Sequence, residues 1–67
     1  MNALAEDILK VLEKQTEPMS IHDIIVALPS HDVYDVKTEL WDLSANGLVR
    51  FDWNWKITRS NDGPATF

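Results

Sequence analysis

Two histidines beside carboxylates come closest to a catalytic arrangement in this sequence. His22 precedes Asp23, and His31 precedes Asp32. A histidine acts as a general base only when its partner faces it in space, and adjacent residues on a helix do not face each other. The chain also has no cysteine and only two glycines, so it lacks a thiol nucleophile and a glycine-rich phosphate loop. We therefore expect a non-enzymatic protein with neither a cofactor nor a metal, and two surface histidines.

Cations alternate with aromatic rings near the end of the chain. The residues in this pattern are Arg50, Phe51, Trp53, Trp55, Lys56 and Arg59. Cations contact phosphates and aromatic rings stack on bases, so the pattern suits nucleic acid. The simpler interpretation is that Val49, Phe51 and Ile57 close a core while the cations keep a hairpin soluble. Both interpretations stay open at this point.

A third candidate surface lies on the segment 32–47, which is predicted to form one helix. Asp32 is a favourable N-cap with Asp35 as its capping-box partner, and Asn46-Gly47 is a helix-stop signal. Apolar residues recur at helical spacing and predict the buried face: Val33, Val36, Leu40 and Leu43.

The remaining residues of this helix form an acidic edge and an outward-facing aromatic side. The acidic edge is Asp32, Asp35, Glu39 and Asp42, and the outward side is Tyr34, Thr38, Trp41 and Ala45. Exposed tryptophan and tyrosine dominate interface hot spots, and small monomers rarely leave large rings in water without use. An acidic rim selects a basic partner surface. We predict a protein-binding site made of Tyr34, Asp35, Thr38, Glu39, Trp41 and Asp42.

Two alternatives to this protein-binding surface stay open. Trp41 and Trp55 could pack on each other to extend a thin core, because small domains recruit aromatic rings for burial. The same patch could instead join two copies of the chain in a symmetric homodimer.

Length and composition set limits on these functions. With 67 residues, 45% of them hydrophobic, the chain forms one small domain held by packing without disulfides. The formal net charge is −5. Four acids and one lysine give residues 32–48 a charge of −3, whereas three cations and two acids give residues 49–67 a charge of +1. There is no apolar run long enough for a membrane span and no secretion signal, so we expect a cytoplasmic protein that does not enter membranes.

Two shorter helices precede the segment 32–47. Asn2 caps the first helix, and Glu17-Pro18 is expected to end it. Ser20 caps the second helix, with Asp23 as its reciprocal partner. The apolar positions of the two helices are Leu4, Ile8, Val11, Leu12, Ile21, Ile24, Ile25 and Leu28.

After Gly47 the pattern changes to β-strand. Runs rich in β-formers at 48–52 and 55–59 predict a hairpin, with Asp52-Trp53-Asn54 as its tight turn. Asn54 is the residue expected to take a positive φ. Residues 60–67 lack periodicity and are expected to form a flexible tail.

This order of elements resembles the winged-helix family of helix-turn-helix domains over residues 3–59. The motifs that carry the resemblance are Met19-Ser20-Ile21, Leu40-x-x-Leu43, Asn46-Gly47-Leu48-Val49 and Trp55-x-Ile57-Thr58. The resemblance implies an α+β, mostly α, domain at 1–59, with three helices and a C-terminal two-stranded β-hairpin wing. Trp41 and Trp55 also match aromatic positions of the Z-nucleic-acid-binding Zα domains, but an acidic edge replaces a basic one and the wing carries no proline.

The resemblance makes a small DNA-binding regulator the alternative function. In helix-turn-helix proteins the start of the third helix reads the major groove. Here that part carries carboxylates and a single cation, and carboxylates repel phosphates. Charge therefore disfavours nucleic acid, and the wing is the better candidate surface for it. The alternative nucleic-acid-binding residues are Lys37, Arg50, Trp53, Trp55, Lys56 and Arg59.

Overall fold

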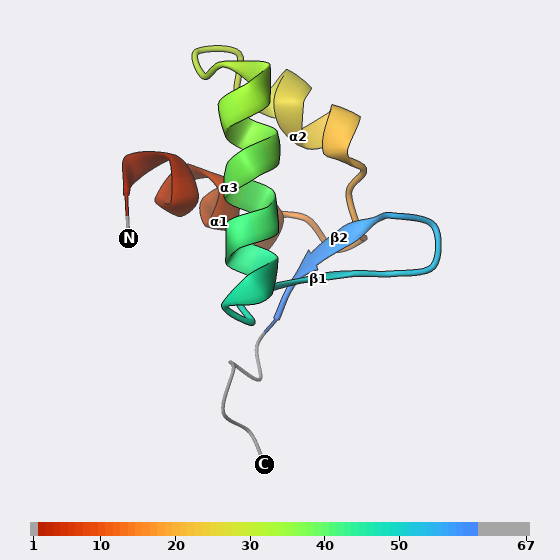
Figure 1. Cartoon of the computed structure of the whole chain (residues 1–67). Coiled ribbons are helices and arrows are strands. Elements are labelled where there is room, and N and C mark those ends of the chain that lie inside the picture. Colours follow the sequence, from red (N-terminus) through yellow and green to blue (C-terminus); the bar gives the residue numbers. More distant parts are fainter. Residues whose placement is uncertain (1, 61–67) are drawn as a thin grey trace.

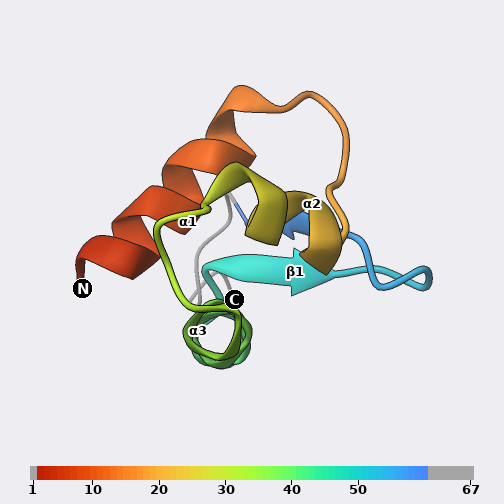
Figure 2. The same ribbon diagram turned by 90° about the horizontal axis from the view of Figure 1, so that it is seen from above.

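The computed structural model describes residues 2–60, which form three helices followed by a two-stranded antiparallel hairpin (Figure 1). The elements are α1 (Ala3–Lys14), α2 (Ile21–Ala27), α3 (Val33–Ala45), β1 (Val49–Phe51) and β2 (Ile57–Arg59). This is the predicted α+β arrangement of a winged helix. Seen from above, α3 is viewed end-on, with β1 between it and the pair α1 and α2 (Figure 2).

Each helix begins at the residue that the sequence predicts. The Asn2 side chain accepts the first-turn N–H of Ala5 at 2.7 Å. At the start of α2, Ser20 Oγ accepts the Asp23 N–H at 3.0 Å and Asp23 Oδ2 accepts the Ser20 N–H at 3.2 Å, which completes a capping box. Asp32 caps α3 by accepting two backbone N–H groups of its first turn. These bonds satisfy donors that a helix start otherwise leaves unpaired.

The end of α1 differs from the prediction, because the helix stops at Lys14 and not at Glu17-Pro18. Residues 15–18 leave the helix and carry Met19 to the side of β2. There the Met19 N–H donates to the Ile57 carbonyl at 3.0 Å, and the Ile57 N–H donates back to the Met19 carbonyl at 2.6 Å. Pairing with a strand requires extended backbone, so this bridge ends the helix before the proline does.

The core lies where the three helices meet the hairpin, and most of it was predicted. Its buried residues are Ala5, Ile8, Leu9, Leu12, Met19, Ile24, Leu28, Val36, Leu40, Leu43, Val49 and Ile57. The prediction was wrong for Val33, which is 46% exposed. Val33 is the first residue of α3, beside the exposed turn that follows α2, so the elements that cover Val36 and Leu40 do not reach it.

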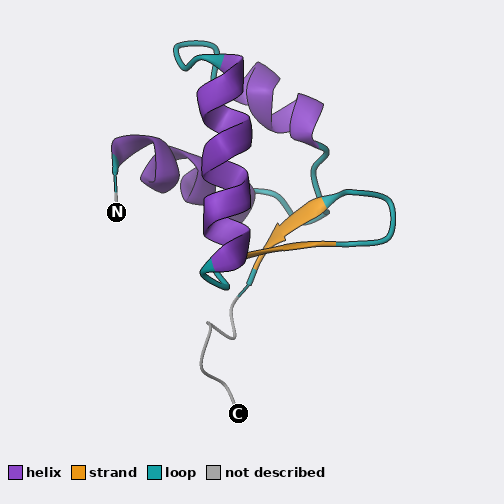
Figure 3. Cartoon of the chain, in the orientation of Figure 1, coloured by secondary structure: helices purple, strands orange, loops and turns teal. Residues whose placement is uncertain are grey.

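Gly47 ends α3 as predicted, with a φ of 75° that suits glycine. The chain then enters a hairpin whose paired strands are shorter than predicted and whose loop is longer (Figure 3). The register places Phe51 opposite Ile57, and the Ser60 N–H extends the pairing by donating to the Leu48 carbonyl at 3.0 Å. The rest of the predicted tail lies outside the described residues.

The hairpin loop contradicts one prediction. Trp55, not Asn54, takes the positive φ, at 59°. The physical reason is that the side chain of Asp52 binds the N–H groups of both Asn54 and Lys56. The chain therefore completes its reversal at Trp55, one residue later than a tight turn would.

Candidate functional site

The outer face of α3 is divided between two neighbourhoods. On one side, the ring of Trp41 stacks on Phe51 of β1. On the other side, Glu39 Oε1 accepts a hydrogen bond from Asn2 Nδ2, at the start of α1, at 3.0 Å. The predicted protein-binding residues are therefore not one patch, because the aromatic ring of Trp41 points to the wing and Glu39 points to α1.

The wing side carries an aromatic cluster, which we define as Trp41, Phe51 and Trp55. The Trp41 and Phe51 rings stack with centroids 4.9 Å apart and planes 15° apart. Trp55 meets both rings edge-on, at 6.2 Å from Trp41 and 6.0 Å from Phe51. Offset stacks and edge contacts at these separations are the favourable arrangements of aromatic pairs. The three rings therefore hold one another in place.

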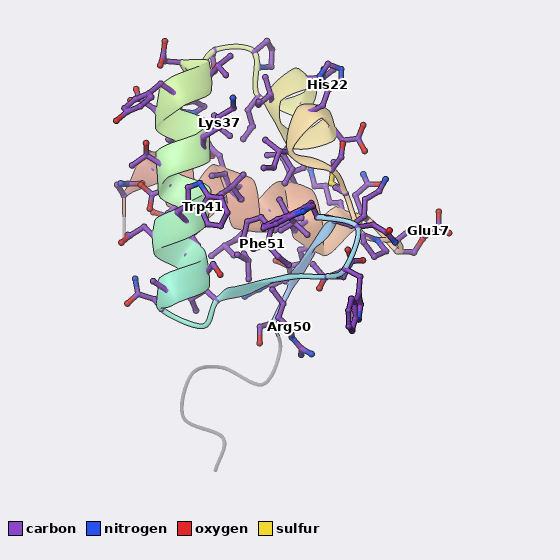
Figure 4. The ribbon with its side chains drawn as sticks, turned by 45° about the vertical axis from the view of Figure 1, so that its right-hand side comes forward. Glu17, His22, Lys37, Trp41, Arg50 and Phe51 are labelled. Carbon is purple, nitrogen blue, oxygen red and sulfur yellow. The ribbon has the colours of Figure 1, made fainter. Side chains whose placement is uncertain are left out.

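The aromatic cluster stays open to solvent although its rings touch. Trp41 is 52% exposed and Trp55 is 62% exposed, while Phe51 is half-buried against the core. Figure 4 shows Trp41 reaching from α3 toward Phe51 on the hairpin. The rings of Trp41 and Trp55 thus pack on each other and still present about half of their surface to solvent.

Three elements position the aromatic cluster. Leu40 and Leu43 are buried and hold α3 against the core, which turns the intervening Trp41 outward. On the hairpin, Ile57 of β2 is fully buried and lies directly opposite Phe51 of β1. The burial of Ile57 therefore holds the hairpin, and with it Phe51, against the core. Residues opposite each other in a non-bonded antiparallel pair bring their side chains close together.

Trp53 stands apart from the aromatic cluster. It lies in the hairpin loop and is 98% exposed. The sequence groups it with Trp55, but the reversal of the chain between them sends the two rings to different surroundings.

The opposite side of α3 borders an open hollow of about 360 Å³. Its lining residues are Asn2, Leu4, His31, Tyr34, Asp35, Thr38 and Glu39. Thr38 Oγ1 donates to the Tyr34 carbonyl at 2.9 Å, and the Tyr34 ring is 73% exposed. Within residues 2–60 there is no group of three or more side chains that could hold a metal ion.

His31 is paired, but not with its sequence neighbour. Its Nε2 lies 3.0 Å from Oδ2 of Asp7, on α1. His31 is half-buried there and ties the turn before α3 to α1. The pair joins residues 24 positions apart, so no local pattern in the sequence predicts it.

The cations of the alternative nucleic-acid site are spread over several sides of the molecule. Arg59 Nη1 lies 2.6 Å from Glu13 Oε2 on α1. Arg50 points away from Phe51, whereas Lys37 lies on the same side of α3 as Trp41 (Figure 4). Lys56 lies near enough to Asp23 to act on its carboxylate. These residues do not converge on one positive face.

The chain has no match among protein-family models, curated proteins or solved structures. In the part of the chain from residue 2 to residue 60, no helix has both the length and the apolar content to cross a membrane.

The carboxyl of Asp23 has a pKa below its ordinary value. Hydrogen bonds from the backbone and then the side chain of Ser20 lower its pKa, and Lys56 adds a smaller effect in the same direction. Hydrogen bonds to a carboxylate stabilise its charged form. This shift arises in the capping box of α2, where the same hydrogen bonds stabilise the start of the helix.

Proposed function

We propose that this chain is a non-enzymatic winged-helix module that binds a protein partner through its aromatic cluster. The observation that carries the proposal is that Trp41 and Trp55 touch each other while remaining 52% and 62% exposed. Large rings already fixed in place lose little conformational freedom on binding, so more of their buried area contributes to affinity.

The order of three helices and a hairpin supports membership of the winged-helix family. That likeness alone does not select a ligand, because such folds host many functions. The class of ligand must therefore be inferred from the charges and side chains on the surface.

Charge favours a protein over nucleic acid as the ligand. Phosphate binding needs several cations on one face, but Arg59 is engaged by Glu13 and Arg50 lies on the other side of the hairpin from Phe51. The formal net charge of −5 adds a general repulsion of polyanions. Asp42 follows Trp41 on α3, and its exposed carboxylate suits a partner whose rim is basic.

A capture experiment tests the proposal. The wild-type chain and two variants, Trp41→Ala and Trp53→Ala, are immobilised and exposed to extract at physiological salt. Bound proteins are identified by mass spectrometry and the binding is repeated with the purified candidate. We expect the Trp53→Ala variant to bind as the wild type does and the Trp41→Ala variant to lose binding.

A gel-shift with mixed-sequence duplex at low salt, run beside the capture, tests the alternative. Retardation that weakens steeply with salt and is reduced by Arg50→Ala together with Lys56→Ala would replace the proposal with nucleic-acid binding. The same double variant should leave protein capture unchanged, because neither cation belongs to the aromatic cluster.

A further inference from the structure

Trp55 holds a backbone conformation that its side chain disfavours. Its φ is 59°, and it is the single non-glycine residue with a positive φ in the described part of the chain. The left-handed region crowds the Cβ atom, so bulky residues rarely occupy it. Asn54, the immediate neighbour, tolerates that region far better but does not occupy it. Some interaction must therefore hold Trp55 in place.

Asp52 supplies that interaction with both its side chain and its backbone. Its Oδ1 accepts the N–H groups of Asn54 at 2.8 Å and of Lys56 at 2.9 Å. Its carbonyl accepts the Trp55 N–H at 3.1 Å, and its own N–H donates to the Lys56 carbonyl at 2.9 Å. The residues immediately before and after Trp55 are thus bound to one carboxylate, and Trp55 itself is bound to the same residue.

The consequence is the placement of the third ring of the aromatic cluster. In this conformation the Trp55 ring meets Trp41 with planes 78° apart and Phe51 with planes 70° apart. A strained backbone persists only when the surroundings over-determine it, and such residues gather at binding sites.

We infer that Asp52 is a positioning residue, which holds Trp55 in the left-handed conformation and so assembles the aromatic cluster before any partner arrives. That the assembled aromatic cluster serves to bind a partner rests on the proposed function. The positioning itself is a property of the free chain and is tested there.

The first experiment compares Asp52→Ala with Asp52→Asn. Asparagine keeps a side-chain oxygen at the Oδ1 position, whereas alanine removes it. Two tryptophans in edge contact produce an exciton couplet in the far-ultraviolet circular dichroism spectrum, and Trp41→Phe identifies the couplet of Trp41 with Trp55 by removing it. We expect Asp52→Ala to lose most of this couplet with its helical signal retained, and Asp52→Asn to keep it. A full couplet in Asp52→Ala would overturn the inference.

The second experiment does not depend on how Asp52→Ala folds. Trp55→Gly and Trp55→Ala both remove the ring, but only glycine tolerates the left-handed region without strain. We expect the glycine variant to melt at a higher temperature than the alanine variant, the reverse of the order in ordinary extended backbone. A higher or equal melting temperature for the alanine variant would show that no left-handed strain exists at residue 55.

The two proposals fail in distinguishable ways. If the couplet and the melting order come out as expected while no partner is captured, the proposed function fails and the positioning of Trp55 stands. If the couplet survives Asp52→Ala, the positioning fails whatever the capture experiment finds.

Discussion

Replacing Trp41 with alanine should weaken the fold by a measurable amount without unfolding it. The ring of Trp41 joins α3 to the hairpin through its stack on Phe51 and its edge contact with Trp55. Because it is 52% exposed, a little under half of its surface is covered by these contacts and by the helix itself. The loss of stability should scale with that covered part.

The expected size follows from the covered area. A whole tryptophan buries up to about 250 Å², so Trp41 removes about 120 Å² from water. At about 25 cal/mol per Å² this contributes about 3 kcal/mol. The better helix propensity of alanine returns about 0.5 kcal/mol, and a compact unfolded chain lowers the area term further, which leaves a net loss of about 2 kcal/mol. A domain of this length has roughly 3–10 kcal/mol of stability, so we expect the variant to stay folded.

Urea and thermal unfolding measure this loss, and Trp53→Ala is the matched control. Trp53 is 98% exposed, so the same substitution there should change the free energy of unfolding by less than about 0.5 kcal/mol. Trp41→Ala should lower the melting temperature by about 10 °C. Equal stability of the two variants would refute the reasoning, because it would mean that the Trp41 ring makes no contact with the wing in solution.

Three further predictions concern the supports of the fold. Asp32→Ala removes the side-chain cap of α3 and should cost about 1 kcal/mol in urea unfolding; no loss would show that the cap is dispensable. The pKa of Asp23 is lowered from 3.8 in the folded chain, so its stabilising effect is present above that value and is lost as the pH falls through the lower, folded pKa. Between neutral pH and about pH 2, the free energy of unfolding should therefore fall more steeply in the wild type than in Asp23→Asn. Parallel curves for the two proteins would contradict this. Arg59→Ala breaks an exposed ion pair with Glu13 and should change stability by less than about 0.5 kcal/mol in the same assay.

Local signals made the helices and most of the core predictable. The caps Asn2, Ser20 and Asp32 act on backbone groups two or three residues away, so short stretches of sequence contain all that their hydrogen bonds need. Buried positions such as Leu40 and Leu43 followed from the helical period for the same reason. The function remains a proposal, because no local signal identifies the partner.

Three features of the structure escaped prediction, and two of them are built from residues distant in the sequence. The half-buried pair of His31 and Asp7 depends on how α1 packs against the turn before α3. The conformation of Trp55 depends on the side chain of Asp52 and overrides the ordinary preference of Asn54 for a positive φ. The inclusion of Phe51 in the aromatic cluster required the path of β1 beside α3. Tertiary contact decides the outcome for His31 and Phe51, whereas at Trp55 a local side-chain bond to the backbone overrides residue propensity.

The two hydrogen bonds between Met19 and Ile57 tie the loop end of the paired strands to the segment between α1 and α2, so this end opens only together with the helices. To free the Ile57 N–H, the chain must detach the segment between α1 and α2 and expose a side chain that has no contact with solvent. Amide exchange at Ile57 should then be as slow as in the middle of α1, since both require global unfolding.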